Sequence, residues 1–495
     1  MQHELPMPKA QVIGAGLSGL YAACYLSGKG YEVSVYEKNE SVGGRSRTFE
    51  ADGFKFDMGP SWYWMPELID RLFQDLDEQR EDYFRLQRLN PSYRVFWKDT
   101  APTDIPASME GLKDLFDSFE LKGGPKLEKF LADAKVKYEV AAKNFLFQPG
   151  LKWKELAKPD VLKYFFQLHL FKSVNREVEG MFRSQKARAL LNFPVLFLGE
   201  MPNRIPSLYT LMNYADFGLG TWYPEGGMSA LAKALEKIAI KNGVQFHFNS
   251  PLEGVSVTGK RVDHIQVSGQ ELSVDNLLIS ADYHFVEQNI LPKEYRSYSE
   301  EYWDGRKLAP SCLIYYLGID EKVPNLLHHN LFFDENLEEH GKQIYSNPSW
   351  PDKPLFYVCA PSKTDDSVAP EGKENLFVLI PVAPDLKPEK ETKDRFLEVV
   401  LQRIEKQCGV DLTDKISYRR DYCVEDFKTD YNAFKGNAYG LANTLKQTAN
   451  LKPKITSRIE NLMYCGQLTV PGPGVPPALI SGQLAATQII KTTKI

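Results

Sequence analysis

Residues 9–37 read KAQVIGAGLSGLYAACYLSGKGYEVSVYE, and this stretch decides the fold. The apolar run 9–13 predicts a short buried strand. The run 20–26 has helical spacing, and Gly30 is expected to end that helix. A second strand over 31–36 leads into Glu37. Strand, glycine turn, helix, strand and acid in this order predict a dinucleotide-binding βαβ unit.

The glycines of this turn have separate physical roles. Gly14 allows the tight turn, Gly16 lets the backbone approach a pyrophosphate, and Gly19 lets helix and strand pack closely. The helix then begins with free N–H groups that attract the diphosphate. Glu37, which follows Gly14 by 23 residues, is placed to accept hydrogen bonds from a ribose. The alternative is a glycine-rich turn without a ligand. The predicted cofactor contacts also include Leu17, Ser18 and Lys38.

The next residues distinguish between dinucleotides. Residues 41–47 read SVGGRSR, and a G-G-R after the acid resembles FAD proteins of the amine-oxidase-like class. Gly43 and Gly44 would let the chain pass the cofactor, and Arg45 would offer a cation to the diphosphate. Alternatively, Arg45 and Arg47 are surface charges. Residues 56–61, FDMGPS, resemble a segment that passes near the flavin, which adds three predicted contacts: Gly59, Pro60 and Ser61. We therefore predict FAD as the cofactor.

Three distant blocks make the resemblance more specific. They read GTWYPEGGM at 220–228, APSKTD at 360–365 and GQLTVPGPGVP at 466–476. Together with the amino-terminal stretch they resemble carotenoid desaturases of the bacterial phytoene desaturase type, over residues 9 to 490. The sequence is also similar to the branch that introduces the 3,4 double bond into 1-hydroxylated carotenoids.

The resemblance implies a mixed α/β, two-lobed flavoprotein of the amine-oxidase-like type, with a Rossmann-type FAD domain and a discontinuous substrate domain. We expect the FAD domain to comprise residues 1–89, 223–300 and 441–495. The substrate domain would comprise 90–222 and 301–440 and would contact a membrane.

The resemblance also assigns roles near the carboxyl end. The terminal block would return to the flavin, and the helix starting near Val475 and Pro476 would point N–H groups at the isoalloxazine ring. Gly466 belongs to the same predicted site. Many relatives have an acidic residue where this chain has Gln467, which puts the ribityl contact in doubt. The resemblance further places Val255 against the adenine.

Composition excludes other classes. The net charge of −5 gives no support for a nucleic-acid partner. The six cysteines are not spaced as metal ligands or as a disulfide framework, and His328–His329 has no cysteine or acid close by in sequence. We therefore expect no metal site. The first residues resemble no signal peptide, and no window has the roughly 18 uninterrupted apolar residues of a membrane span. A cytoplasmic protein lying on the membrane surface is expected.

The substrate side is less defined. Residues 161–171 are rich in large apolar side chains, and 152–188 contain nine Lys or Arg against four Asp or Glu. This pattern fits an interfacial membrane contact, although a core helix with a basic face fits equally. We find no catalytic triad. Lys154 and Glu155 are weak candidates for polar groups near the tunnel, with surface charge as the alternative.

The leading prediction is an FAD-dependent oxidoreductase that desaturates an acyclic or hydroxylated carotenoid taken from the membrane, passing electrons to oxygen or a quinone. The favoured branch is a 1-hydroxycarotenoid 3,4-desaturase, with a phytoene or zeta-carotene type desaturase as the alternative. Relatives of other activity stay open: a carotenoid isomerase, a polyene saturase or an amine oxidase. A non-enzymatic prenyl-binding protein of the same fold, like the GDP-dissociation inhibitors, is disfavoured by the intact nucleotide signature.

Overall fold

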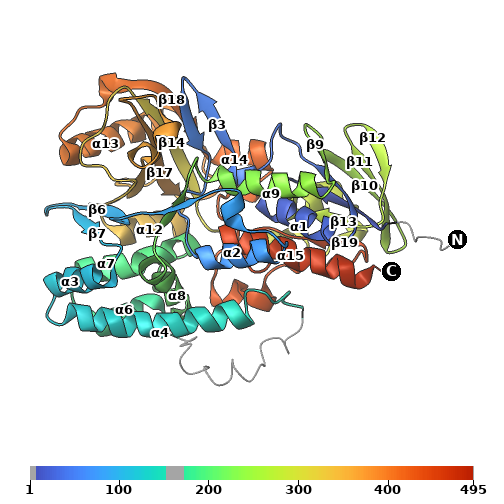
Figure 1. The fold of residues 1–495 in the computed structure, drawn as a ribbon, viewed down its shortest axis with the longest axis horizontal. Helices are drawn as coiled ribbons and strands as arrows, with labels where there is room; N and C mark the ends of the chain where they lie inside the picture. Colours follow the sequence, from blue (N-terminus) through green and yellow to red (C-terminus); the bar gives the residue numbers. More distant parts are fainter. Residues whose placement is uncertain (1–6, 152–171, 494–495) are drawn as a thin grey trace.

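The computed structural model describes residues 7–151 and 172–493. Figure 1 shows two lobes, with the amino- and carboxyl-terminal ends of the chain in the same lobe. The main sheet of each lobe combines strands from distant parts of the sequence, so segments that are hundreds of residues apart lie together.

A five-stranded parallel sheet is the centre of the first lobe. Its strand order is β19-β13-β1-β2-β9, and the strands are β1 (Lys9–Ile13), β2 (Glu32–Tyr36), β9 (Gln245–His247), β13 (Leu277–Ile279) and β19 (Leu462–Tyr464). The predicted βαβ unit is therefore present. Its helix α1 (Leu17–Ser27) ends earlier than expected, because Gly28 already caps it and residues 28–30 form a turn.

Helices cover this sheet. Helix α1 contacts both α9 (Ser229–Lys241) and the last helix, α15 (Val475–Thr492). Their facing side chains form one buried apolar cluster with α2 (Pro66–Gln74). A small antiparallel sheet of β10 (Leu252–Thr258), β11 (Arg261–Val267) and β12 (Gln270–Ser273) belongs to the same lobe. The last helix thus returns the end of the chain to its first helix.

A seven-stranded mixed sheet organises the second lobe. The order is β18-β14-β17-β16-β15-β6-β7, with β6 (Tyr93–Trp97), β7 (Thr103–Ile105), β14 (Ser311–Ile319), β15 (His329–Phe333), β16 (Phe356–Cys359), β17 (Glu374–Val382) and β18 (Ile416–Tyr422). Because side chains alternate along a strand, the sheet has two different faces. On β14, Leu313 and Tyr315 pack toward α13 (Lys390–Cys408), whereas Cys312 and Ile314 belong to the other cluster.

That other face is covered by helices. They are α3 (Met109–Phe119), α4 (Gly123–Asn144), α6 (Val174–Met181), α7 (Gln185–Asn192) and the short α8 (Leu211–Asn213), and their apolar side chains share one cluster with the sheet. Figure 1 shows α4 along the outer edge of this lobe.

The remaining strands and α-helices are short. They are the hairpin β3 (Thr48–Ala51) and β4 (Phe54–Asp57), the pair β5 (Leu86–Arg88) and β8 (Trp222–Pro224), and the helices α10 (Tyr283–Phe285), α11 (Glu300–Asp304), α12 (Leu337–Tyr345) and α14 (Val424–Tyr431). Within residues 7–151 and 172–493, no helix combines the length and apolarity required to cross a membrane.

Candidate functional site: an FAD cradle that opens into an apolar cavity

One large cavity of about 750 Å³ joins the two lobes. At one end it is lined by the glycine turn after β1 and by the start of α15. At the other end its walls come from the helix-covered face of the seven-stranded sheet and from α4 and α12. The predicted cofactor-binding residues and the apolar interior of the second lobe therefore line the same cavity.

The two glycine motifs of the amino-terminal stretch lie against each other. The N–H of Gly43 donates to the carbonyl of Ala15 at 2.8 Å, and Gly16 and Gly43 form a parallel bridge. Gly14 has φ +97°, a conformation that favours glycine. The turn after β1 and the G-G-R loop thus form one backbone surface, which the sequence presents as two separate motifs.

Most of the predicted cofactor contacts line the cavity. They are Gly14, Gly16, Leu17, Ser18, Glu37, Lys38, Gly43, Gly44, Arg45, Gly59, Pro60, Ser61, Gly466, Gln467, Val475 and Pro476. Gly19 lies behind them with the packing role predicted for it, since a Cβ there would lie 2.0 Å from the carbonyl oxygen of Gly14. Glu37 is buried, and its carboxylate accepts the N–H of Ala15 at 2.7 Å.

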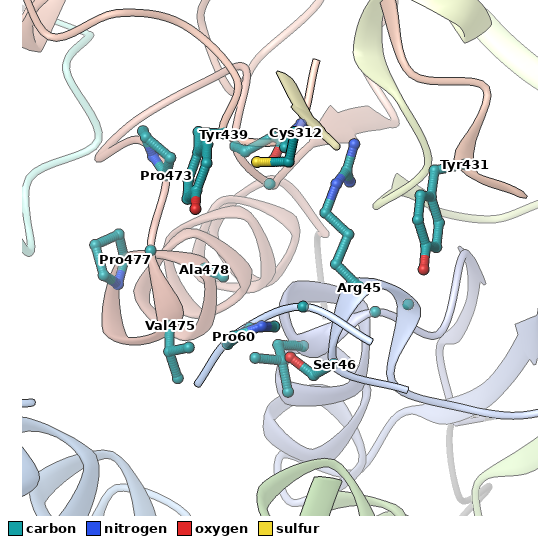
Figure 2. A pocket seen from close by; sticks show the side chains of 18 of the residues that line it. Arg45, Ser46, Pro60, Cys312, Tyr431, Tyr439, Pro473, Val475, Pro477 and Ala478 are labelled. Carbon is teal, nitrogen blue, oxygen red and sulfur yellow. The ribbon is translucent and has the colours of Figure 1, made fainter. Parts of the chain in front are cut away.

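Arg45 provides the test of whether these residues fit FAD. Its Nε atom is buried and has no hydrogen-bond partner among the described residues. Its guanidinium lies 4.9 Å from the ring centre of Tyr431, and Figure 2 shows these two side chains side by side at the cavity. Burial lowers the pKa of Arg45, but the group stays charged because a guanidinium loses its proton only at very high pH. A largely buried cation that forms no ion pair within the described residues, beside a glycine turn, fits a diphosphate.

Arg47 also has a buried Nε without a hydrogen-bond partner among the described residues, but it differs from Arg45 in its ion pair and its position. Its Nη2 pairs with the carboxylate of Asp430 at 2.9 Å, and it does not line the cavity. Of the two arginines in the G-G-R-S-R run, Arg45 is therefore the one that fits the diphosphate, and the surface-charge alternative does not describe it.

The start of α15 corrects the expected helix-end contact. The helix begins at Val475, as predicted, but Pro476 and Pro477 both lack an N–H group. In the first turn Val475 is thus the residue that can donate, and the N–H of Ala478 already donates to Gly474 at 2.9 Å. The helix dipole still points its positive end at the cavity, but not the several N–H groups that were expected.

Gln467 is held by the protein itself. Its Nε2 donates to Asn437 Oδ1 at 3.0 Å, and the same amide group lies 3.0 Å from the Nη2 of Arg45. It lines the cavity, so a contact to a ribityl chain stays a prediction.

Val255 does not line the cavity, so its contact with the adenine stays a prediction. Its side chain is buried in the cluster between β10 and the parallel sheet, whereas Ser250, Pro251 and Leu252 line the cavity. An irregular register between Leu252 and Gly254 shifts the alternation of side chains along β10. This break could not be read from the sequence.

The substrate end of the cavity is mainly apolar. It is lined by Trp62, Trp64, Leu68, Phe193, Leu196, Ile314, Leu331, Phe333, Leu355, Phe356 and Leu379, among others. Tyr439 and Cys312 line the same cavity, and Figure 2 shows Tyr439 next to Pro473 of the terminal block. Sequence reasoning missed Tyr431, Tyr439 and Cys312, because none of them belongs to a recognisable local pattern.

Cys359 lies close to the histidine pair, His328 and His329. His329 on β15 lies opposite Cys359 on β16, and the ligand atoms of His328, His329 and Cys359 all lie within 4.8 Å of one another. The expectation that no cysteine accompanies the pair is therefore wrong in three dimensions. Burial lowers the pKa of His328 to about 3, and that of His329 falls well below its ordinary value, so both are neutral. The absence of a metal stays a prediction.

Lys154, Glu155 and the apolar stretch 161–171 lie outside the described residues.

Lys452 is a buried lysine that the sequence analysis did not identify. Lys452 is 3% exposed, and its Nζ has no hydrogen-bond partner within the described parts of the chain. It lies beside Gly472 of the terminal block, and burial lowers its pKa to about 7.

Comparison with known proteins agrees with this geometry. The family model described as flavin containing amine oxidoreductase matches residues 17–490. Among curated relatives, a carotenoid 3,4-desaturase of Haloarcula japonica is 39% identical, over 97% of each chain. A zeta-carotene-forming phytoene desaturase of Myxococcus xanthus is 30% identical, over 97% of this chain and 93% of the relative. These names confirm the resemblance to carotenoid desaturases.

Solved structures show the same fold. An oxidoreductase from Methanosarcina mazei has a TM-score of 0.61 at 17% identity and covers 96% of this chain and 99% of its own. Putrescine oxidase bound to putrescine has a TM-score of 0.60 at 14% identity, over 98% of this chain and 100% of its own. With the FAD cradle and the match over nearly all of its length, the chain belongs to the flavin-containing amine oxidoreductase family and is an FAD-dependent oxidoreductase.

Proposed function

We propose that the protein is a carotenoid desaturase that introduces a double bond at the 3,4 position of an acyclic carotenoid, with a 1-hydroxylated carotenoid as the preferred substrate. The observation that carries the proposal is the continuity of the FAD cradle with a mainly apolar cavity. A polyene needs such a cavity because burial of its carbons is its main source of binding free energy. The names of the relatives support the same substrate class.

The chain contributes binding and exclusion of water to this reaction. Bound FAD supplies the oxidising power by accepting a hydride from a carbon next to a double bond. Trp62, Leu331 and Leu379 hold an apolar chain beside it and keep water away. The cation that hydride loss would leave on the polyene is delocalised and would lose a proton from the neighbouring carbon to form the double bond. A weak acceptor such as the reduced cofactor would suffice for that proton, so a strong base is not required of the protein.

The substrate also sets where the enzyme works. Transfer of about 40 carbons from lipid to water costs on the order of tens of kcal/mol at roughly 0.8 kcal/mol per carbon. We therefore propose that the protein lies on the cytoplasmic membrane surface, loads substrate directly from the bilayer and passes electrons to oxygen or a quinone. The end of the cavity lined by Tyr138 and Ala141 of α4 and by Leu146 is the proposed entrance.

The two lobes give the proposal its domain division. We assign residues 1–89, 223–300 and 441–495 to FAD binding and 90–222 and 301–440 to the substrate. All strands of the parallel sheet fall in the first set, and all strands of the seven-stranded sheet fall in the second, which supports this assignment.

The test uses FAD-loaded protein with liposomes that contain either phytoene, an unhydroxylated acyclic carotenoid with a longer conjugated system, or its 1-hydroxylated form. We expect loss of two hydrogens from the hydroxylated substrate, seen as a red shift in absorbance and a mass two units lower. Stepwise loss from phytoene would replace the 3,4 assignment with an early desaturase. A product of unchanged mass would contradict desaturation and indicate an isomerase.

A further inference from the structure

Two hydroxyl groups interrupt the apolar wall of the cavity close to the cofactor end. Ser61 follows the D-x-G-P segment, and Tyr357 lies on β16, and both line the cavity. Several other polar side chains of the cavity wall have their own protein partners. Tyr138 is bound to Glu67, Tyr209 to Thr448, and both ring nitrogens of His340 to backbone groups.

Ser61 and Tyr357 belong to a hydrogen-bonded chain that begins at His329. The hydroxyl of Tyr357 donates to Ser61 Oγ at 3.0 Å, and His329 Nδ1 lies 2.6 Å from the Tyr357 oxygen. A tyrosine has one proton to donate, and it goes to Ser61. The Cys359 thiol also interacts with this hydroxyl, but burial raises the pKa of the thiol to about 12, so it stays protonated and is a weak acceptor. His329 Nδ1 must therefore carry a proton and donate it to Tyr357.

The opposite side of the imidazole agrees with this tautomer. With the proton on Nδ1, a neutral His329 has a bare lone pair at Nε2, and that atom is buried without a partner in the described structure. Burial and the neighbouring His328 hold the pKa of His329 well below its ordinary value, so the ring is neutral. It stacks on Trp62 with 4.1 Å between ring centres, which fixes its orientation.

The direction of the chain decides what it can bind. His329 donates to Tyr357 and Tyr357 donates to Ser61, so the proton of the Ser61 hydroxyl is left for an acceptor in the cavity. No other hydrogen bond of that hydroxyl occurs among the described residues. Each bond of such a chain polarises the next, which strengthens the last donor. An apolar carbon cannot accept this bond, but an oxygen atom can.

We propose that the Ser61–Tyr357–His329 chain binds an oxygen atom carried by the end group of the polyene, in the form of a hydroxyl. The inference rests on the proposed function and adds to it a residue-level source of selectivity. An end-group oxygen that entered the apolar cavity without a partner would lose its hydrogen bonds to water, and Ser61 replaces one of them. A polyene without the oxygen leaves the Ser61 donor unpaired.

The test measures binding rather than turnover. Trp62 and Trp64 line the cavity, so energy transfer from tryptophan to the bound polyene reports its dissociation constant. We compare a 1-hydroxylated carotenoid with the same carotenoid lacking the hydroxyl, using FAD-loaded protein in detergent micelles. The wild type should bind the hydroxylated form about tenfold more tightly, the value of one good hydrogen bond.

Four variants separate the explanations. Ser61→Ala should bring the ratio of dissociation constants close to one, Tyr357→Phe should lower it partly, and Ser61→Thr should restore it. Tyr209→Phe is the matched control, because it removes a hydroxyl from the same wall that is bound to Thr448, and its ratio should stay at the wild-type value. An equal fall in Tyr209→Phe would overturn the proposal.

The flavin is the competing acceptor for the Ser61 proton. If Ser61 donates to the cofactor, Ser61→Ala will shift the absorbance spectrum and midpoint potential of the bound flavin with no carotenoid present, and the binding ratio will not change. That outcome would overturn the inference. If the wild type binds both polyenes but oxidises neither, the proposed function fails, while the binding ratio still decides the role of Ser61.

Discussion

The two ends of the cavity are built in different ways. The cofactor end is mainly backbone: glycines at 14, 16, 43 and 44 and the start of a helix approach each other closely, with Arg45 as the cation. The substrate end is mainly side chains, supplied by alternate residues of strands that are paired across long stretches of sequence. Backbone geometry restricts the residues that are tolerated, whereas an apolar wall accepts many combinations of the same volume.

The largest effect is expected from a substitution that disrupts the glycine turn at the cofactor end of the cavity. In Gly19→Ala the new methyl carbon would lie 2.0 Å from the carbonyl oxygen of Gly14, which requires the helix and the turn to separate. We expect a cost above about 4 kcal/mol and no folded flavoprotein. Bound FAD is measured by absorbance, and folding by denaturant titration.

Gly16→Ala is the matched control for that experiment. A Cβ at Gly16 meets no atom within 4 Å, and the φ of −70° suits alanine. The variant should therefore fold normally, yet bind FAD on the order of ten to a hundred times more weakly if the diphosphate approaches this point. Unchanged FAD affinity in Gly16→Ala would contradict the placement of the diphosphate at this turn.

This contrast explains what the sequence could predict. Gly14, Gly16, Gly19 and Glu37 lie within one local βαβ unit, whose spacing is dictated by a turn and a ligand, so their roles could be inferred before any fold was known. Arg45 followed from its position after that unit. The orientation of the Val255 side chain could not be inferred in this way, because it depends on an irregularity in β10.

The residues that meet at the substrate end could not be predicted from the sequence, and the reason is physical. Tyr357 and His329 meet because β15 and β16 pair antiparallel, and Ser61 reaches them from a segment almost 300 residues away in sequence. No local pattern encodes such a contact. Alternation along β16 does show that Tyr357 and Cys359 share a face, but only the sheet order shows that this face borders a cavity.

The role of the substrate end in binding the polyene can be tested by a substitution that fills part of the cavity. Leu379 lines the cavity from β17, and Leu379→Trp would occupy space that a polyene needs. We expect desaturation to fall by at least about a hundredfold, a loss of roughly 3 kcal/mol, with FAD still bound. The rate is measured in liposomes. Leu379→Met, which keeps the volume, should stay near the wild-type rate, and equal activity of both variants would show that the polyene binds elsewhere.

The cation of the backbone end gives a further comparison. Arg45→Gln removes the charge beside the glycine turn and should weaken FAD binding about tenfold to a hundredfold, as expected for a charge-assisted hydrogen bond. Equilibrium dialysis against FAD measures this. Arg47→Gln removes a charge that is already paired with Asp430 and should change the FAD affinity less than about threefold. The reverse order would exchange the roles of the two arginines.

The smallest effect concerns Lys452, which lies beside Gly472 of the terminal block. Burial lowers its pKa in the folded protein from 10.5 to about 7, whereas in the unfolded chain the amine stays protonated up to about pH 10.5. Between these values the unfolded state binds more protons, so the free energy of unfolding should rise with pH. The slope is at most about 1.4 kcal/mol per pH unit for one group.

Lys452→Met isolates that contribution. We expect the stability of the variant, relative to wild type, to be greatest near pH 7 and to fall as the pH is raised toward 10, because only the wild type gains stability in this range. Urea titrations at pH 7, 8 and 9 with saturating FAD measure the difference. A constant difference would mean that Lys452 is charged in the folded protein and has an anionic partner when FAD is bound. That partner would then lie at the terminal block beside Gly472.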